Sequence, residues 1–318
     1  MKNILIFRTD RIGDFLITSP IISSLKRNYP NCKIDIICSD LNYNYIKTFK
    51  VFHKVYKYPV FFIKKILFFF NLKSYDLILA LDGKKRSIYI SLLKFCKKKY
   101  LLTPSSFFKN LFKPFFQKIY LINYNLPKIQ LIKNIILDLN CDYHANDINF
   151  LKHYENITSL KYKSELNNYI LLNFDEKWIF KHYLNSYQKI EPSFDEFVFF
   201  LEKLRQNKKN IVITNGFKKN FILEFLSTSN FLKKNKNIIL KNNICIFELQ
   251  FLIKNADIII TCHGAASHIA SNYNKKIIDI VDLSEKNFFE SYNFHFKNKN
   301  QIFRRNFLET SEEILKAL

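Results

Sequence analysis

The segment that most constrains the fold is residues 1–30. An apolar run, Asn3–Phe7, is followed by the polar turn Arg8–Asp14 and then by a helical segment. An apolar run of this kind needs cover on both faces, as a central strand of a parallel sheet does. The turn places Gly13 and Asp14 at the carboxyl end of that strand, where open α/β sheets bind their ligands.

Strand and helix patterns alternate along the rest of the chain, which favours an α/β fold. Buried strand patterns such as Tyr75–Leu81 and Tyr169–Phe174 are separated by helical ones. Periodicity fades around residues 145–168, so we expect two Rossmann-like domains, 1–165 and 166–318. Their mostly parallel sheets would face each other across a cleft, with the last helix able to pack back on the first domain.

Charge is the strongest compositional signal. The formal net charge is +23, and residues 43–118 hold 17 basic side chains against 2 acidic ones, Asp76 and Asp82. Such a field attracts polyanions, namely nucleic acid, anionic lipid headgroups or a phosphorylated glycolipid. Lysine is abundant along the whole chain, so a solvated lysine-rich surface is the alternative interpretation.

Other features argue against several classes of protein. The six cysteines are scattered with no CxxC pair, which disfavours zinc and an organised disulfide framework. No signal peptide precedes the first strand, and the apolar run Val60–Phe70 is broken by two lysines and too short for the roughly 20 residues that span a bilayer. We therefore expect a cytoplasmic protein, and a peripheral position at the inner membrane is left open by the charge.

Two strand-to-helix turns of the first half carry candidate site residues. The first turn contains Arg11, Gly13 and Asp14. The carboxylate of Asp14, at a strand end, can act as a general base toward a hydroxyl, and Gly13 allows the backbone to approach a ligand closely. The alternative is that Asp14 only caps the following helix. The second turn offers three cations, Lys84, Lys85 and Arg86, or simply a solvated basic turn.

Two turns of the second half suit a phosphorylated ligand. Asn173 ends a strand, and Lys177 in the loop that follows can neutralise a phosphate; the alternative is an ordinary loop lysine beside a core tryptophan. His263, Gly264, Ala265, Ser267 and His268 open a helix after a strand. The exposed N–H groups and the dipole of such a helix suit a pyrophosphate. A zinc site lacks a third ligand nearby, and structural histidines are the alternative.

Taken together, these segments resemble glycosyltransferase family 9, the lipopolysaccharide heptosyltransferases. The opening Asn3–Asp14, with Thr18-Ser19-Pro20, resembles the N-terminal signature of that family. Three further segments match the family more weakly and lie in order along the chain: Tyr75–Ile78 through Ser87, Lys177-Trp178, and Ala256 through His268.

The resemblance implies a GT-B fold and an inverting, metal-independent transfer from a nucleotide sugar, most simply an ADP-linked heptose, to an anionic glycolipid such as the lipopolysaccharide core. It places Asp14 on the base, Lys177 on the donor-phosphate lysine, Asn173 on a donor contact and His268 on the histidine of the donor loop. No cofactor or metal is implied. The partners would be the nucleotide sugar, the glycan acceptor and the cytoplasmic face of the inner membrane, with no nucleic acid.

The sequence also departs from the family pattern. His263-Gly264-Ala265 stands where the family has Asp-Ser/Thr-Gly, no acidic residue follows the second strand of the second half near Gly216, and Ala80 replaces an aspartate. These departures leave the sugar and the nucleotide open.

Two alternatives belong to other classes of protein. A non-catalytic basic protein could bind nucleic acid, although no RRM, KH, zinc-finger or helix-turn-helix signature is visible. An inactive relative of the same fold could dock at membranes through Val60–Phe70 and Phe107–Tyr120, unless these aromatic runs simply pack in the core.

Overall fold

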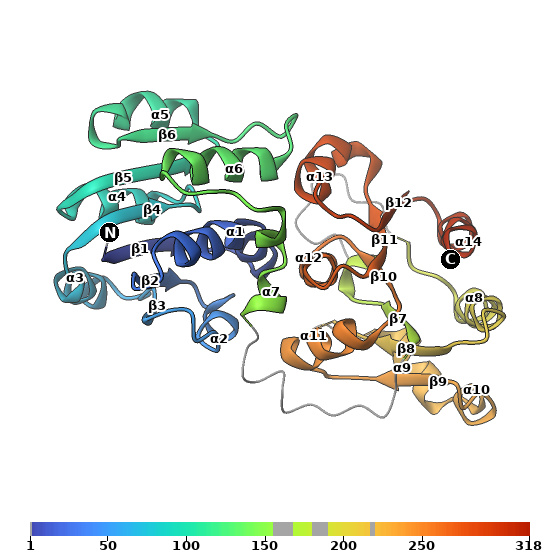
Figure 1. Cartoon of the computed structure of the whole chain (residues 1–318). Coiled ribbons are helices and arrows are strands. Elements are labelled where there is room, and N and C mark those ends of the chain that lie inside the picture. The colour runs from blue at the N-terminus through green and yellow to red at the C-terminus, as the bar shows by residue number, and fades with distance from the viewer. Residues whose placement is uncertain (1, 155–167, 180–189, 217–219) are drawn as a thin grey trace. The chain divides into compact units, whose positions relative to one another are not determined.

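Two compact units make up the chain, Met1–Ile157 and Thr158–Leu318. The structure, a computed structural model, describes residues 2–154, 168–179, 190–216 and 220–318, and only the backbone of Phe62. The expected boundary between residues 165 and 166 lies outside the described residues. Each unit contains one six-stranded sheet (Figure 1), as the alternating pattern predicts, and each is described by itself.

The first unit is built on a parallel sheet. Its strands are β1 (Asn3–Arg8), β2 (Lys33–Cys38), β3 (Lys54–Lys57), β4 (Tyr75–Ala80), β5 (Cys96–Thr103) and β6 (Lys118–Leu121). They lie in the order β3-β2-β1-β4-β5-β6, the strand order of the Rossmann fold. Strand β1 pairs in parallel with β2 on one side and β4 on the other, so the opening apolar run is a central strand as predicted.

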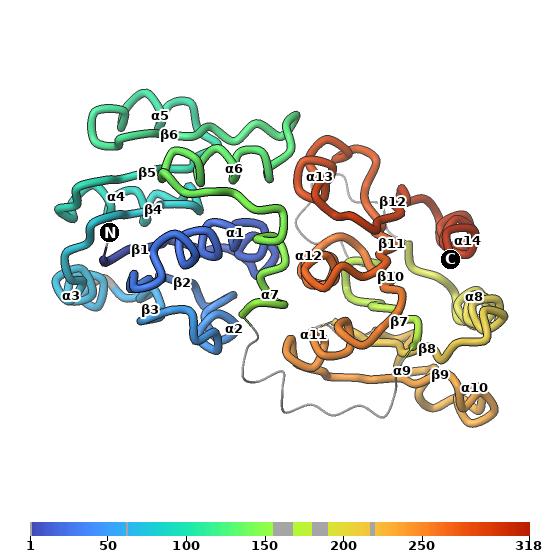
Figure 2. Tube along the Cα trace, viewed as in Figure 1, coloured from blue at the N-terminus to red at the C-terminus, as the bar shows by residue number. Residues whose placement is uncertain are grey.

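Helices cover both faces of this sheet. They are α1 (Ile12–Asn28), α2 (Tyr43–Ile46), α3 (Phe62–Asn71), α4 (Lys85–Leu93), α5 (Ser106–Phe112), α6 (Lys128–Asp138) and α7 (Phe150–His153), with the 3-10 turns η1 (Lys113–Phe115) and η2 (Ala145–Ile148). Leu5 and Phe7 of β1 join an apolar cluster with Ile88 of α4 and Phe112 of α5. On the other face α1 contacts α6 and α7, and Figure 2 traces this grouping along the chain.

Helix α1 carries a proline in its interior, Pro20. Proline has no N–H, so the carbonyl of Leu16, four residues earlier, lacks its helical donor. The hydroxyl of Ser19 donates to that carbonyl at 2.7 Å, and both residues are buried. Ser19 therefore satisfies a buried acceptor that the proline leaves open.

The second unit repeats the same sheet order from the other edge. Its strands are β7 (Tyr169–Asn173), β8 (Asn210–Thr214), β9 (Ile238–Lys241), β10 (Ile258–Cys262), β11 (Lys276–Val281) and β12 (Lys299–Phe303). They lie in the order β12-β11-β10-β7-β8-β9, with parallel pairing throughout the described strands. This is the Rossmann order once more, which confirms the prediction of an α/β fold in both halves.

One aromatic core anchors this unit. Its helices are α8 (Phe194–Arg205), α9 (Phe221–Thr228), α10 (Asn230–Lys234), α11 (Ile246–Asn255), α12 (Ala265–Asn272), α13 (Lys286–Asn293) and α14 (Phe307–Ala317), with the turns η4 (Glu176–Trp178) and η5 (Leu283–Glu285). Trp178 is fully buried against Phe174 and Phe307. Phe307 brings α14 onto α8 and β12, so the last helix buries its apolar side within its own unit.

The local predictions were not all correct. The pattern of the segment Phe107–Tyr120 predicts a basic, aromatic loop, whereas the segment forms most of α5, all of η1 and most of β6, and the pattern predicts nothing for α13 and β12. Phenylalanine and lysine alternate without a clear period in the first segment, and β12 is a mostly polar edge strand, so neither helical nor strand periodicity stands out. By contrast, Ser193 followed by Glu196 three residues later predicts a capping box, and the two side chains form one at the start of α8.

No helix within the described part of the chain is both long and apolar enough to cross a bilayer.

We expect Ser19→Ala to lower the free energy of unfolding by roughly 1–2 kcal/mol, because it leaves the buried Leu16 carbonyl without a donor. Chemical denaturation measures this loss. In the Pro20→Ala background the loss should be smaller, since residue 20 then supplies the missing N–H. Equal losses in the two backgrounds would contradict this account of the helix.

Candidate functional site

Each sheet has one position at which its strand order reverses, between β1 and β4 in the first unit and between β7 and β10 in the second. Open α/β sheets bind ligands outside the carboxyl ends of the strands at such a position. Asp14 and Arg86 follow β1 and β4, while Lys177 and Gly264 follow β7 and β10. The candidates from the sequence therefore lie at the two places where this architecture holds ligands.

A buried arginine organises the position in the first unit. Arg8 is 1% exposed, and its guanidinium lies 3.1 Å from Asp10 Oδ1 and 3.5 Å from Asp14 Oδ1. It also donates to the backbone carbonyls of Asp14, at 2.9 Å, and Leu81. The ammonium of Lys128, at the start of α6, lies 3.9 Å from Asp14 Oδ1. Two carboxylates and two cations thus form one cluster, the Arg8 cluster.

Burial changes the protonation of two members of the Arg8 cluster. It raises the pKa of Asp10 to about 7, against the opposing effect of Arg8 and with the help of the nearby Asp14 and Asp82. It lowers the pKa of Lys128 to about 8, although the Asp14 carboxylate acts in the other direction. Both shifts favour the neutral forms, so this cluster can take up and release protons near neutral pH.

Asp14 keeps a partly exposed carboxylate in this cluster, with 23% of its side chain accessible. The N-cap of α1 is Arg11 and not Asp14, so the alternative interpretation of Asp14 as the cap residue is wrong. Arg11 is exposed, whereas Gly13 is buried in the first turn of the helix. Asp14 therefore has a carboxylate that solvent can reach at the carboxyl end of β1.

The turn after β4 is tied to the turn after β1. The carboxylate of Asp82 accepts hydrogen bonds from the Thr9 hydroxyl at 2.5 Å and from the Ser87 hydroxyl at 2.7 Å. Arg86 donates to the hydroxyl and the carbonyl of Thr9, at 2.7 and 2.8 Å. Arg86 thus has a structural task, whereas Lys84 and Lys85 beside it are exposed.

Gly83 forms the corner of this second turn. Its φ is +61°, and a Cβ there would lie 2.9 Å from Pro104 Cδ. A side chain would therefore be both strained and crowded.

A row of polar side chains crosses the second sheet near its carboxyl edge. In register across five strands lie Thr214, Asn173, Thr261, Asp279 and Gln301. The Asn173 amide donates to the Thr261 hydroxyl at 3.0 Å and to Asp175 at 3.1 Å, and its oxygen accepts from Thr214 at 3.1 Å. Asn173 is 2% exposed, so its polar atoms join strands β7, β8 and β10.

The lysine predicted to bind phosphate lies against the glycine that precedes α12. The Nζ atom of Lys177 would be 2.7 Å from a Cβ placed on Gly264, and it forms an ion pair of 2.5 Å with Asp175. Gly264 and Ala265 are partly exposed at the first turn of α12. A cation, the first turn of a helix and close backbone access therefore coincide, a combination that suits a diphosphate.

Arg304 fixes the loop that carries this lysine. Its buried guanidinium donates to the carbonyls of Lys177, at 2.5 Å, and Trp178, at 3.1 Å. The preceding carboxylate, Glu176, reaches the end of β8, where its Oε2 would be 1.6 Å from a Cβ on Gly216. An acidic group thus stands beside the end of β8 although the local sequence there has none.

His263 and Ser267 point to a buried carboxylate. Asp279 lies 2.8 Å from His263 Nδ1 and accepts hydrogen bonds from Ser267 at 2.7 Å and Asn293 at 3.0 Å. Burial would raise the pKa of Asp279, but His263 and these hydrogen bonds together hold it below its usual value. Both predicted donor ligands are therefore engaged inside the unit and fix the start of α12.

His268 belongs to the same interior. It is 3% exposed, and its ring meets those of His263 and Phe296 edge to face. His295 lies across from it at 6.3 Å between ring centroids, and burial lowers the pKa of His295 to about 3. These rings form an apolar wall under α12 in which His295 stays neutral.

Sequence reasoning missed several residues that organise these positions. Arg8, Asp10 and Lys128 were not singled out in the first unit, nor Asp279 and Arg304 in the second. Asp279 had a usable signal, because an aspartate inside an apolar strand must have buried partners. Lys128 and Arg304 had none, since nothing local shows that these side chains are buried.

No group of three or more His, Cys, Asp and Glu side chains in the described ranges could hold a metal ion.

Comparison with solved structures identifies the fold. The E. coli heptosyltransferase WaaC with ADP superimposes with a TM-score of 0.71 at 12% identity, over 99% of this chain and 98% of that one. A glycosyl transferase of family 9 from Veillonella parvula gives 0.69 at 11% identity, over 99% and 96%. The fold is therefore the GT-B fold that the sequence resemblance implies.

The same architecture serves another reaction as well. A UDP-GlcNAc 2-epimerase from Methanocaldococcus jannaschii matches with a TM-score of 0.56 at 15% identity, over 100% of this chain and 91% of that one. No protein-family model and no curated protein matches the sequence.

Asp10→Asn should stabilise the protein in a pH-dependent way. The unfolded chain releases the Asp10 proton near the ordinary pKa of 3.8, whereas the folded chain keeps it until about pH 7. The contribution of Asp10 to wild-type stability therefore falls as the pH rises from 3.8 to about 7, and asparagine removes this loss. The gain of the variant should grow from about pH 4 to about pH 7 and stay constant above, as measured by denaturation across pH. The exposed Asp142→Asn is the control, and a gain independent of pH would contradict the buried cluster.

Proposed function

We propose that this chain is a glycosyltransferase that moves a sugar from a nucleotide donor to a hydroxyl of a glycan. The observation that carries the proposal is the position of Lys177 Nζ against Gly264 at the first turn of α12. The same resemblance that predicts the fold favours an ADP-linked heptose or a related sugar as donor. The acceptor proposed is the lipopolysaccharide core or another anionic surface glycan, and neither a nucleic acid nor a cofactor is expected.

The donor half of the reaction belongs to the second unit. The diphosphate would lie at the N-terminus of α12, where Gly264 and Ala265 leave room for its oxygens. Negative charge grows on it as the bond to the sugar breaks, and the Lys177 ammonium and the helical N–H groups stabilise that charge. Arg304 and Asp175 hold the lysine in place. These groups supply the positive charge that a metal would otherwise provide, so metal independence is part of the proposal.

The acceptor half belongs to the first unit. The Asp14 carboxylate takes the proton of the acceptor hydroxyl, whose oxygen forms the new bond to the anomeric carbon. The bond from that carbon to the diphosphate breaks, and the nucleoside diphosphate leaves with the electron pair. Attack opposite the leaving group inverts the configuration. Arg8 and Lys128 orient Asp14, and the exposed Arg11, Lys84 and Lys85 attract an anionic acceptor.

A transferase differs from two other functions, a nucleotide-sugar epimerase and a non-catalytic binding protein, in the substrates that it requires. A nucleotide-sugar epimerase needs no acceptor, so product should form with the donor alone. A non-catalytic binding protein should consume no donor at all. The transferase is supported by turnover that depends on an added glycan acceptor and that a metal chelator leaves unchanged.

Lys177→Ala should weaken ADP binding roughly 10- to 100-fold, because a charged hydrogen bond to phosphate is lost. Titration calorimetry with ADP measures the change. Lys233→Ala, an exposed lysine of α10, is the matched control and should bind like the wild type. An unchanged affinity in Lys177→Ala would remove this residue from the donor site.

Asp14→Asn should reduce transfer roughly 100- to 10,000-fold, the usual loss of a general base, while ADP affinity stays the same. Initial rates with a glycan acceptor and calorimetry with ADP separate the two effects. Asp10→Asn is the informative comparison, because it alters the same cluster. If Asp10→Asn abolished transfer and Asp14→Asn did not, the base would be Asp10.

A further inference from the structure

Exposed apolar side chains gather on one part of the first unit. Of the 23 large apolar side chains exposed among the described residues, 12 lie between Val60 and Phe115. They belong to α3 and the residues before it, to the end of α4, and to α5 and η1. We call this surface, residues 60–70, 89–99 and 106–117, the apolar basic face.

Helix α3 presents most of these side chains. Ile63 and Phe70 are each 73% exposed, and Ile66 and Leu67 are exposed too. Only one side of the helix is held, where Phe68 packs on the tyrosines of β3 and the residue after it. A helix that keeps so many aliphatic side chains in water lacks a partner for that surface.

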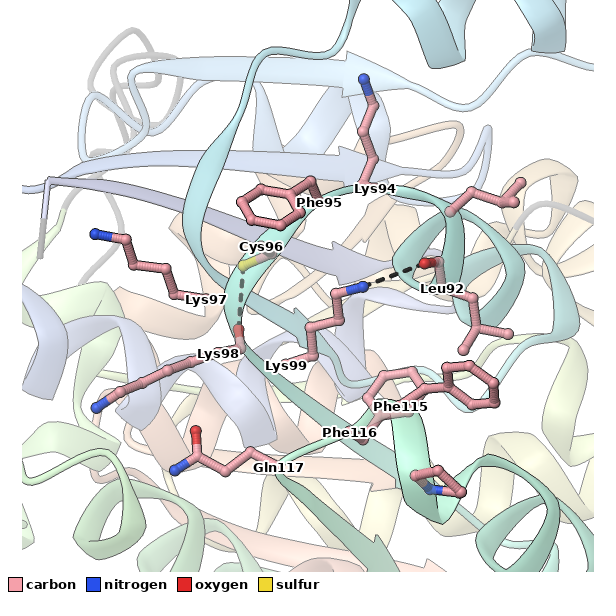
Figure 3. A pocket seen from close by; sticks show the side chains of 12 residues that line it. Leu92, Lys94, Phe95, Cys96, Lys97, Lys98, Lys99, Phe115, Phe116 and Gln117 are labelled. Carbon is pink, nitrogen blue, oxygen red and sulfur yellow. Dashed lines mark hydrogen bonds between the residues drawn. The ribbon is translucent and has the colours of Figure 1, made fainter.

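A groove continues this surface beyond α3. It encloses about 780 Å³ between the end of α4, the start of β5 and η1. Lys94 joins the two parts, because its ammonium lies 4.6 Å from the Phe69 ring and donates to the carbonyl of Leu72. Lys99 donates to the Leu92 carbonyl at 3.2 Å, as Figure 3 shows. These two lysines therefore shape the groove.

The other two lysines of the groove remain exposed. In Figure 3, Lys97 and Lys98 extend from β5 into the open, beside Phe95, which is 85% exposed. The nearest acidic residue along the chain is Asp82, and the charge of Asp76, in β4, interacts with that of Lys97. Residues 83–117 contain nine Lys and Arg and no Asp or Glu. The surface thus combines an excess of positive charge with aliphatic and aromatic side chains.

We propose that the apolar basic face docks on a lipid bilayer that carries anionic headgroups. Lys97 and Lys98 would contact headgroup phosphates at the groove, while Ile63, Phe70 and Phe95 enter the boundary of the acyl chains. Basic residues beside apolar ones are the combination that holds a helix in a membrane interface.

Charge and shape argue for this occupant over two others. A second copy of the chain would set the same positive face against itself, so the lysines would repel. Single-stranded nucleic acid could stack on the exposed phenylalanines of this face, but it would leave the aliphatic side chains Ile63, Ile66 and Leu67 of α3 in water. A bilayer satisfies both the charge and the aliphatic surface.

The position of the face fits a membrane-borne substrate. Strand β5 begins at Cys96 in the groove, whereas Asp14 and Asp82 follow the carboxyl ends of their strands. Six residues of strand span about 20 Å. A docked chain would therefore hold its Arg8 cluster above the membrane, within reach of a protruding glycan. This last step rests on the proposed function, but the docking itself does not.

Vesicle sedimentation tests the docking without any sugar donor. The full chain should pellet with vesicles of phosphatidylcholine and phosphatidylglycerol and bind phosphatidylcholine alone much more weakly. Lys97→Gln with Lys98→Gln should weaken binding about 30-fold, since each lysine near an anionic surface contributes about 1 kcal/mol. Phe70→Ser with Phe95→Ser should weaken it at least about tenfold.

Matched pairs on the second unit serve as controls. Lys233→Gln with Lys234→Gln removes two exposed lysines, and Phe199→Ser with Phe221→Ser removes two exposed phenylalanines. Both should bind vesicles like the wild type, and circular dichroism checks the fold of every variant.

Three results would overturn the proposal. One is equal binding by the variants of the face and the controls. Another is a wild-type chain that stays off anionic vesicles, or prefers an oligonucleotide to them. The third is self-association that the face variants abolish, which would assign the face to a second copy. The sedimentation assay contains no sugar donor, so its result does not depend on whether the chain catalyses transfer.

Discussion

The architecture of the second unit depends on keeping one fully buried carboxylate ionised. Asp279 lies inside strand β11, where burial without partners would cost several kcal/mol. Its partners come from three places: His263 before α12, Ser267 within α12, and Asn293 at the end of α13. Satisfying this charge therefore fixes the first turn of α12, the same turn at which we propose that the diphosphate binds. The histidine that departs from the family pattern belongs to this internal support.

In the first unit the buried charge is a cation, Arg8. Arg8 cannot lose its charge, so the turn after β1 folds back to surround it with Asp10, Asp14 and two carbonyls. Burial, with the help of the nearby Asp14, raises the pKa of Asp10, and Asp14 is the more exposed of the two carboxylates. The partly exposed carboxylate that we propose as the base thus lies where the turn compensates an arginine.

The two edges of the first sheet carry different chemistry. Charged side chains that form ion pairs and hydrogen bonds with their neighbours lie at the carboxyl ends of β1 and β4. Near the start of β5, lysines and apolar side chains lie without acidic neighbours on the same segment, residues 83–117. A parallel sheet separates these surfaces by the length of its strands, so one unit can provide a reaction site and a docking surface that do not compete.

Local pattern was enough for the α/β fold, the central strand Asn3–Arg8, and the strand ends that carry Asp14, Lys177 and Gly264, because apolar runs and turn residues report burial along a short segment. It failed for α13 and β12, where polar composition hides the period. Which side chains a ligand can reach was decided only by packing: Arg86, Asn173, His263 and Ser267 bond inside their units, while Lys128 and Arg304 are drawn in from distant segments. Burial and charge compensation are properties of neighbours in space, which no single stretch of sequence contains.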